Sequence, residues 1–376
     1  MSAAPEIKGW CPGAHAPMSS GDGLVVRIRP PLGRLTPAQA AGVATLSMAH
    51  GNGIIELSSR ANVQLRGVTP ESHRALLDGL DALGLLDASA DVEARRNVLV
   101  QPFWRAGDET YRFAVALTSA LRASGAPQVP HKFGFVLDTG PQPVLRQASG
   151  DIRLERGATG DLIVVASGMG RGKPVTPDSG VAEMLALARW FLETRKDETR
   201  MARLLAHGAV PPPGFSAPRG IGSGEPDIGV TASGAMIGLP FGQLQAQTLQ
   251  QLSEHGALRL TPWRKLLIEG ARRLPRIEGV ITDPADPLLR VMACPGTDGC
   301  TQAHVETRAL ARALAPRVPE GAKLHVSGCA KGCANPRPAD LTVVGTDAGL
   351  SMVRNGRASD APSAAQLTPH DIAKAL

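Results

Sequence analysis

Four cysteines within forty positions constrain this chain more than any other feature. Five residues separate Cys294 from Cys300, and three residues separate Cys329 from Cys333, whereas Cys11 lies far away. Both pairs lie beside glycines, as in Cys294-Pro-Gly-Thr-Asp-Gly-Cys300, and glycine lets a backbone pass close to an inorganic core. Four thiolates are the ligands of a cubane iron–sulfur cluster. We therefore predict that these four cysteines bind one [4Fe–4S] cluster.

Other uses of the cysteines are weaker hypotheses. Zinc sites favour pairs that are two to four residues apart, so the five-residue gap argues against zinc. Disulfides need an oxidising compartment, and residues 1–13 do not resemble a secretory signal. Buried, unliganded cysteines are common, but not four at this spacing. We expect a cytoplasmic, reducing location, and for Cys11 a structural role.

Composition limits the partners. Lysine and arginine number 40 against 34 acidic residues, and aromatic residues make up 3% of the chain. There is no basic run and little aromatic surface for stacking bases, so we expect no nucleic-acid partner. No apolar run is long enough to cross a bilayer, so we expect no membrane partner. The small basic excess suits a polyanionic small molecule.

The chain contains two copies of a strand–helix–strand unit. The first copy covers residues 24–57, with Thr36 as the expected helix N-cap, and the second covers residues 235–260. Leu57 corresponds to Leu260 at a spacing of 203 residues. Units of this size predict small ferredoxin-like sheets.

The downstream segments repeat in the same order. Asp161-Leu-Ile-Val-Val165 is similar to Asp340-Leu-Thr-Val-Val344. A helix expected at 109–123 parallels one expected at 301–314, whose N-terminus would face the cysteine loop with its positive dipole. We predict an α+β fold in which duplicated ferredoxin-like halves are related by a pseudo-two-fold axis and accompanied by two α/β domains. The expected boundaries are 20–70 paired with 225–275 for the ferredoxin-like halves, 71–207 for the first α/β domain with a basic half-site, 208–224 for a linker, and 276–357 for the second, cluster-bearing α/β domain.

Basic residues form a second group of candidates. Arg60, Arg66, Arg96 and Lys132 each lie near the end of an expected strand, where a sheet presents side chains to a shared crevice. Solvated charge is the usual role of an arginine. Basic residues that converge beside a metal centre would instead bind an anion or a carboxylate-rich macrocycle.

A glycine-rich turn follows an apolar strand at Gly168-Met-Gly170-Arg-Gly-Lys. Its glycine spacing differs from the dinucleotide-binding fingerprint. We interpret Gly168 and Gly170 as a turn that allows a flat cofactor to approach.

The combination of duplicated halves with Cys-x5-Cys and Cys-x3-Cys resembles the sirohaem-type sulfite and nitrite reductase family, from about Gly21 to Leu350. The resemblance implies that Cys333 bridges the cluster to a second iron centre, sirohaem or a mononuclear non-haem iron. It also implies that Arg60, Arg96 and Lys132 serve anion binding and catalysis. We further expect Gln64, Arg66, Asn97, Gly168 and Gly170 to contact a cofactor. One departure is Gly134, where sulfite reductases have a second lysine.

Within this family the opening from Cys11-Pro-Gly to Arg29-Pro-Pro, the stretch Ser58–Gly67 and His131-Lys-Phe-Gly-Phe135 are similar to the branch that acts in aerobic cobalamin biosynthesis. This implies an oxygen-dependent monooxygenase that hydroxylates precorrin-3A at a meso carbon, closes a ring-A acetate to a lactone and so forms precorrin-3B. Dioxygen and a separate electron donor are the implied partners. Two alternatives stay open, a small assimilatory sulfite or nitrite reductase and a non-enzymatic electron-transfer or tetrapyrrole-binding protein.

Overall fold

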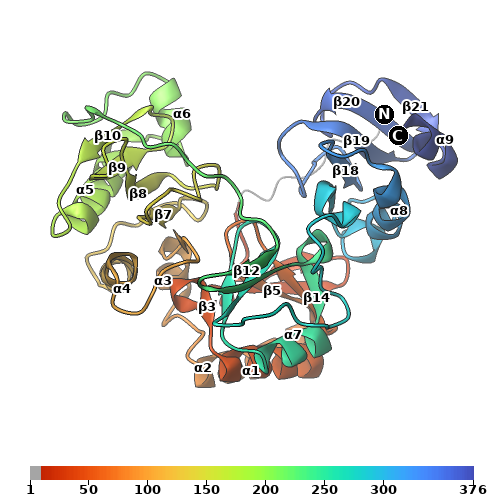
Figure 1. Ribbon diagram of the computed structural model, residues 1–376, viewed down its shortest axis with the longest axis horizontal. Helices are drawn as coiled ribbons and strands as arrows, with labels where there is room; N and C mark the ends of the chain where they lie inside the picture. The colour runs from red at the N-terminus through yellow and green to blue at the C-terminus, as the bar shows by residue number, and fades with distance from the viewer. Residues whose placement is uncertain (1–9) are drawn as a thin grey trace.

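The computed structural model describes residues 10–376 and has three lobes (Figure 1). A central domain, red and orange with teal in Figure 1, is built from two segments that are far apart in the sequence. An α/β lobe from the middle of the chain stands on one side of it, and an α/β lobe from the end of the chain stands on the other. Within residues 10–376 no helix is long and apolar enough to cross a membrane.

The central domain contains two five-stranded sheets, one for each half of the duplication. The first sheet has the order β1-β2-β5-β4-β14 and the second has the order β12-β13-β16-β15-β3. The strands of the first half are β1 (Met18–Ser20), β2 (Gly23–Ile28), β3 (Arg34–Leu35), β4 (Ile54–Leu57) and β5 (Val63–Val68). Those of the second half are β12 (Gly229–Thr231), β13 (Gly234–Gly238), β14 (Gln243–Gln245), β15 (Leu258–Leu260) and β16 (Lys265–Glu269).

The two halves exchange one strand each. Strand β3 belongs to the first half but pairs with β15 of the second, with Leu35 opposite Leu258. Strand β14 belongs to the second half but pairs with β4 of the first, with Leu244 opposite Ile55. All four side chains are buried in one hydrophobic core that both halves share. This reciprocal pairing confirms the duplicated, pseudo-two-fold arrangement.

The helices of the central domain are α1 (Pro37–His50), α2 (Pro70–Ala82) and α7 (Ala246–Ser253), and they lie side by side along the lower edge in Figure 1. Helix α1 begins where the sequence predicts, because the Thr36 side chain accepts a hydrogen bond from the Gln39 N–H and Pro37 occupies the first turn. Leu76 and Leu80 of α2 are fully buried in the shared core.

The short turn before each exchanged strand is duplicated in detail. Leu32 in η1 (Pro31–Gly33) and Phe241 in η2 (Pro240–Gly242) both have positive φ, 56° and 58°, at a spacing of 209 residues. After the helices the spacing falls to 203 residues, as between Gly67 and Gly270. The six-residue difference matches the helices themselves, because α1 has 14 residues and α7 has 8.

The first α/β lobe is built on a six-stranded sheet with the order β11-β10-β9-β8-β7-β6. Its strands are β6 (Val98–Val100), β7 (Phe135–Asp138), β8 (Ile152–Arg156), β9 (Leu162–Ala166), β10 (Arg171–Pro174) and β11 (Ala217–Pro218). Its helices are α3 (Ala90–Arg95), α4 (Glu109–Arg122), α5 (Gly180–Thr194) and α6 (Met201–Ala206). Strand β11 lies within the segment predicted as a linker and pairs with β10, and the adjacent Arg219 bonds to the buried Glu155 at 2.6 Å.

The second α/β lobe carries a sheet with the order β17-β18-β19-β20-β21. Its strands are β17 (Val291–Ala293), β18 (Leu324–Ser327), β19 (Ala339–Thr346), β20 (Gly349–Gly356) and β21 (Ala364–Leu367), and its helices are α8 (Thr307–Leu314) and α9 (Pro369–Ala375). Three successive parallel strands followed by an antiparallel one occur in both lobes, as β6-β7-β8-β9 and β17-β18-β19-β20.

Two details of the predicted repeat were wrong. Residues 340–344 lie in β19, whose counterpart by position is β8, whereas residues 161–165 overlap β9, the counterpart of β20. The similarity between these segments reflects a general buried-strand pattern. In addition, α8 begins at Thr307 and not near Thr301, because residues 301–306 form turns.

Candidate functional site

The four clustered cysteines line a single cavity of about 60 Å³ in the second α/β lobe. Cys294 follows β17 and Cys329 follows β18. These two strands are adjacent and parallel, with Ala293 opposite Val326, so their ends meet at one edge of the sheet. Turns after each strand then bring in the second cysteine of each pair. The cavity is lined by Cys294, Pro295, Cys300, Gln302, Ala303, Ser327, Gly328, Cys329, Lys331 and Cys333.

Small residues make room around the sulfur atoms. The Gly328 N–H donates a hydrogen bond of 3.2 Å to the Cys294 Sγ. A Cβ at position 328 would lie 2.6 Å from the Cβ of Ala303 and 3.6 Å from that Sγ. Gly332, between the last two cysteines, has a φ of 64°, so this segment is a turn and not part of a helix. An amide N–H aimed at a thiolate is typical of iron–sulfur sites.

The thiols lie in surroundings that favour a bound cation. Desolvation of the sulfur by the surrounding protein raises the pKa of Cys333 to about 11, and the neighbouring Cys294 and Cys329 add to the rise. The residue as a whole is nevertheless exposed. Burial also raises the pKa of Cys329. Four mutually repelling thiolates become stable when a cationic cluster binds them. The donor set and its glycine-lined surroundings therefore fit a [4Fe–4S] cluster.

No group of three or more His, Cys, Asp or Glu side chains in residues 10–376 is arranged to hold one metal ion. A cubane differs from such a site because each of its four thiolates binds a different iron atom. All five cysteines lie within the described residues, and all are free thiols.

The basic candidates occupy two different environments. Arg60 is half-buried, and its Nη1 and Nη2 lie 3.3 Å from the Cys11 Sγ and 3.4 Å from the Lys132 carbonyl oxygen. Arg96 is instead 4% exposed and forms a bidentate pair with Asp87, at 2.7 Å for the shortest contact. The structure therefore brings Arg60 and Lys132 together and engages Arg96 in an internal ion pair.

Arg27 joins this group although sequence reasoning did not select it. Its Nε and Nη2 donate to the Gln64 Oε1, and it faces the thiol of Cys11. Burial lowers the pKa of Arg27 to about 10, and the nearby Arg29 and Arg60 lower it further while Cys11 raises it. Among residues 10–376, Arg27 and Arg60 have no carboxylate partner. The alternation of arginines in Arg27-Ile-Arg29 is the one sequence signal that could have selected Arg27.

The other cofactor-binding candidates are spread over the central domain and the first α/β lobe. Gln64 connects Arg27 to Glu56, because its Nε2 donates to the Glu56 Oε2 at 3.2 Å. Asn97 is buried and donates to the Phe133 carbonyl oxygen, also at 3.2 Å. Gly168 has a φ of 102° and packs against Ala202 of α6, and Gly170 follows in the same turn.

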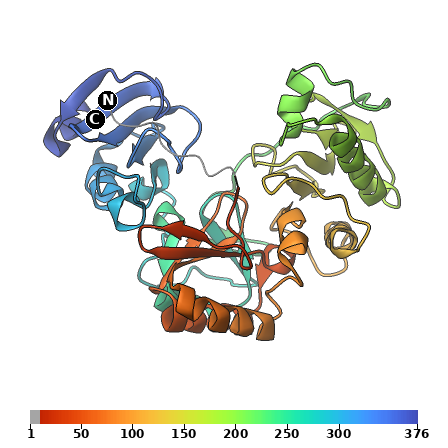
Figure 2. The same ribbon diagram turned by 180° about the vertical axis from the view of Figure 1, so that it is seen from behind.

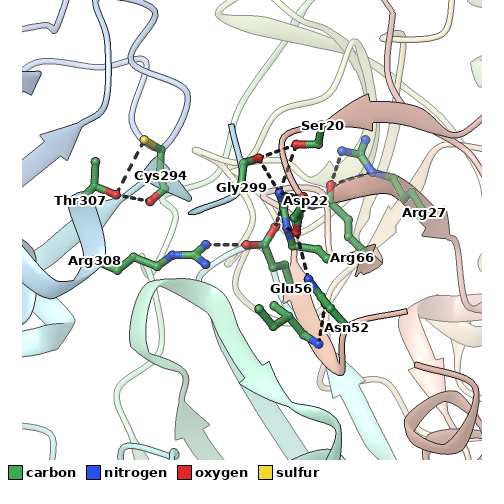
Figure 3. Close-up of polar contacts among 12 residues, drawn as sticks. Ser20, Asp22, Arg27, Asn52, Glu56, Arg66, Cys294, Gly299, Thr307 and Arg308 are labelled. Carbon is green, nitrogen blue, oxygen red and sulfur yellow. Dashed lines mark hydrogen bonds and ion pairs between the residues drawn. The ribbon is translucent and has the colours of Figure 1, made fainter. Parts of the chain in front are cut away.

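Arg66 is buried and points to the cysteine loop. Its Nη2 donates to the Gly299 carbonyl oxygen at 2.7 Å, within the segment that joins Cys294 to Cys300 (Figure 3). On the other side of the loop, the Thr307 hydroxyl donates to the Cys294 carbonyl oxygen at 2.5 Å. The second α/β lobe also contacts the first α/β lobe, because Arg337 donates to the Gln147 Oε1 at 3.0 Å.

Comparison with known proteins defines the class. Residues 16–83 match the nitrite/sulfite reductase ferredoxin-like half domain. The solved structure of the Mycobacterium tuberculosis NirA protein has a TM-score of 0.64 to this chain at 18% identity, covering 88% of this chain and 73% of that one. The fold is therefore that of the nitrite and sulfite reductases.

Sequence relatives that match most of the chain define the family. Precorrin-3B synthase from Sinorhizobium sp is 31% identical over 394 residues, which cover 95% of this chain and 85% of that protein. Ferredoxin–nitrite reductase from Synechococcus elongatus is 25% identical, covering 86% of this chain and 76% of that enzyme. The chain belongs to the precorrin-3B synthase family, within the wider family of nitrite and sulfite reductases.

Proposed function

We propose that this protein is an oxygen-dependent monooxygenase that converts precorrin-3A to precorrin-3B, by meso-carbon hydroxylation and closure of the ring-A acetate to a lactone. The observation that carries the proposal is the convergence of four cysteines on one cavity in a chain 31% identical to a precorrin-3B synthase. Dioxygen is the second substrate, and a separate carrier supplies the electrons.

Cys294, Cys300, Cys329 and Cys333 would hold a [4Fe–4S] cluster, which supplies single electrons when bound. The Gly328 N–H fixes the Cys294 sulfur and spreads its charge. Cys333 is the exposed member of the set, and it would be the thiolate that faces a second iron centre, sirohaem or a mononuclear non-haem iron.

Arg60 and Lys132 would bind the carboxylates of the tetrapyrrole, and Arg27 extends this group. Guanidinium groups without carboxylate partners are suited to that task, because a substrate carboxylate then replaces water and not an internal ion pair. Arg96 and its partner Asp87 would orient the chain beside the substrate. Gln64, Asn97 and the Gly168–Gly170 turn remain proposed cofactor contacts.

Gly134 argues against the reductase alternative. A Cβ at this position would lie 3.0 Å from the Asn97 Nδ2, so a lysine here would require Asn97, which donates to the Phe133 carbonyl oxygen, to shift by a few tenths of an ångström. The charge that a small oxyanion would need is absent at this position. The similarity to nitrite reductase over 86% of the chain is the observation that favours the alternative of a small assimilatory sulfite or nitrite reductase.

The deciding experiment uses protein purified without oxygen. Precorrin-3A and a chemical reductant are added first, isotopically labelled dioxygen is added next, and the product is analysed by mass spectrometry. We expect a product that carries one labelled oxygen atom, and slow reduction of sulfite and nitrite. Efficient six-electron reduction of those anions with unchanged precorrin-3A would overturn the proposal in favour of the reductase. Tetrapyrrole binding without either reaction would favour a non-enzymatic carrier.

A further inference from the structure

We propose that Arg66 and Glu56 are a positioning pair that seats the Cys294–Cys300 loop on the central domain and so sets the geometry of the cluster. This inference rests on the proposed cluster. It gives Arg66 a partner different from the cofactor expected from the sequence, namely the backbone of the Cys294–Cys300 loop.

Every nitrogen of the Arg66 guanidinium has a partner (Figure 3). Its Nε donates to Asp22 at 2.8 Å, its Nη1 donates to Glu56 at 3.2 Å, and its Nη2 donates to Asp22 and to the Gly299 carbonyl oxygen, both at 2.7 Å. The Ser20 hydroxyl donates to the same carbonyl oxygen at 2.5 Å. The residue is 4% exposed. A planar fork held by two carboxylates can present its remaining N–H in one direction, which here is toward Gly299.

Glu56 reaches the other end of the loop. Its second oxygen accepts a hydrogen bond from Arg308 of α8 at 2.5 Å. Arg308 directly follows Thr307, whose hydroxyl holds the Cys294 carbonyl oxygen. Glu56 therefore connects two contacts on the loop, one at Gly299 through Arg66 and one at Cys294 through α8. In Figure 2 the red β1–β2 hairpin lies on the same side of the molecule as the blue second α/β lobe.

The charges of the pair support each other. Burial alone would raise the pKa of Glu56, but Arg308 and Arg66 hold it below its usual value. Burial alone would lower the pKa of Arg66, but Glu56 and Asp22 raise it. Both side chains are therefore charged at neutral pH. A charged donor on a backbone carbonyl makes a stronger contact than a neutral one.

The duplication provides an internal comparison. Arg259 and Glu269 lie 203 residues after Glu56 and Arg66, so the acid and the base have changed places. They also form an ion pair, and Arg259 lies 3.5 Å from the Pro102 carbonyl oxygen in the loop after β6. That loop has no cysteines. Both halves thus have an arginine that bonds to a loop carbonyl oxygen, but the half with Arg66 holds the cysteine loop.

The test compares Arg66→Lys with Arg259→Lys, which are matched because the two arginines are 4% and 6% exposed. Lysine keeps the charge but lacks the fork, so it cannot hold Asp22, Glu56 and Gly299 together. Cysteine alkylation is followed by mass spectrometry on protein stripped of iron. We expect Arg66→Lys to raise the alkylation rate of Cys300 about ten- to hundredfold, the range for loss of one charged hydrogen bond. Arg259→Lys should leave that rate unchanged.

Protein that contains the cluster gives the second readout. Arg66→Lys should alter the EPR signal and lower the iron content of the reduced protein, while Arg259→Lys should match the wild type. Glu56→Gln, which removes one charge and keeps the shape, should shift both readouts in the same direction. Equal Cys300 alkylation in Arg66→Lys and wild type would overturn the inference, as would an equal effect of Arg259→Lys. A wild type without a cluster would overturn the proposed function alone, because the alkylation comparison does not need iron.

Discussion

The Arg60 Nη1 lies 3.3 Å from the Cys11 Sγ, so a cysteine predicted to be structural lies among the predicted anion-binding residues. Burial alone would raise the pKa of this thiol, but Arg27 and Arg60 lower it below its usual value. Cys11 thus lies beside two arginines that have no carboxylate partner among residues 10–376.

The first prediction concerns this thiol. Arg60→Ala should raise the pKa of Cys11 and slow its alkylation near pH 8, because the thiolate loses a neighbouring cation. The rate should be measured against pH for Cys11 alone, by mass spectrometry of the labelled peptide. Arg189→Ala, an exposed change on α5, is the control and should have no effect. Equal rates in both variants would contradict the assigned contact.

The second prediction concerns the cluster ligands. Anaerobically purified protein should contain about four irons and four labile sulfides per chain. Cys294→Ser and Cys329→Ser together should abolish this content, whereas Cys11→Ser should keep it. Iron and sulfide assays with the visible absorbance spectrum are the measurements. Retention of a cluster by the double variant would exclude these cysteines as its ligands.

The third prediction separates Arg60 from Arg96. Arg60→Ala should weaken tetrapyrrole binding about ten- to hundredfold while changing stability little. Arg96→Ala should lower the free energy of unfolding by about 3 kcal/mol, because it leaves Asp87 buried with Arg122 as its remaining partner, at 3.2 Å. Titration of the ligand and urea unfolding test the two effects separately. A stable Arg96→Ala protein that has lost binding would instead place Arg96 in direct contact with substrate.

The fourth prediction concerns pH. His325 on β18 is fully buried, and neither ring nitrogen has a hydrogen-bond partner among residues 10–376. Burial, aided by the cation of Arg264, lowers its pKa from 6.5 to about 4. Between these values the unfolded chain binds a proton that the folded chain rejects, so stability falls as pH falls from 6.5 toward 4.

Replacement of His325 by leucine removes this dependence of stability on pH. Between pH 7 and pH 5, iron-free wild type should lose about 2 kcal/mol more stability than His325→Leu. Urea unfolding at the two pH values gives the comparison. The same pH dependence in both proteins would show that His325 does not resist protonation in the folded state.

Some of this architecture follows directly from the sequence. Thr36, Pro37 and Gln39 form their helix start from local hydrogen bonds, so residue type and spacing are sufficient to predict it. The cysteine pairs lie after hydrophobic segments that become adjacent parallel strands, and the duplicated order of units indicates the pseudo-two-fold fold class.

Other features depend on contacts that sequence spacing does not reveal. Arg96 is paired with Asp87 because α3 turns it back toward a loop nine residues earlier, and Arg66 reaches Gly299 across 233 residues. The exchanged strand β3 has two residues, too few for a recognisable alternation. Burial decides these pairings, and burial is a property of the assembled core.

The exchange of β3 and β14 determines what either half could do alone. A chain that ended before β14 would expose the edge of β4 at Ile55, and a chain that began after β3 would expose the edge of β15 at Leu258. Each exposed edge is a template for the missing strand, and two copies of one half could satisfy each other in the same way. The central domain is therefore a homodimer-like interface joined into one polypeptide, and this covalent connection lets one lobe keep the cysteines while the other diverges.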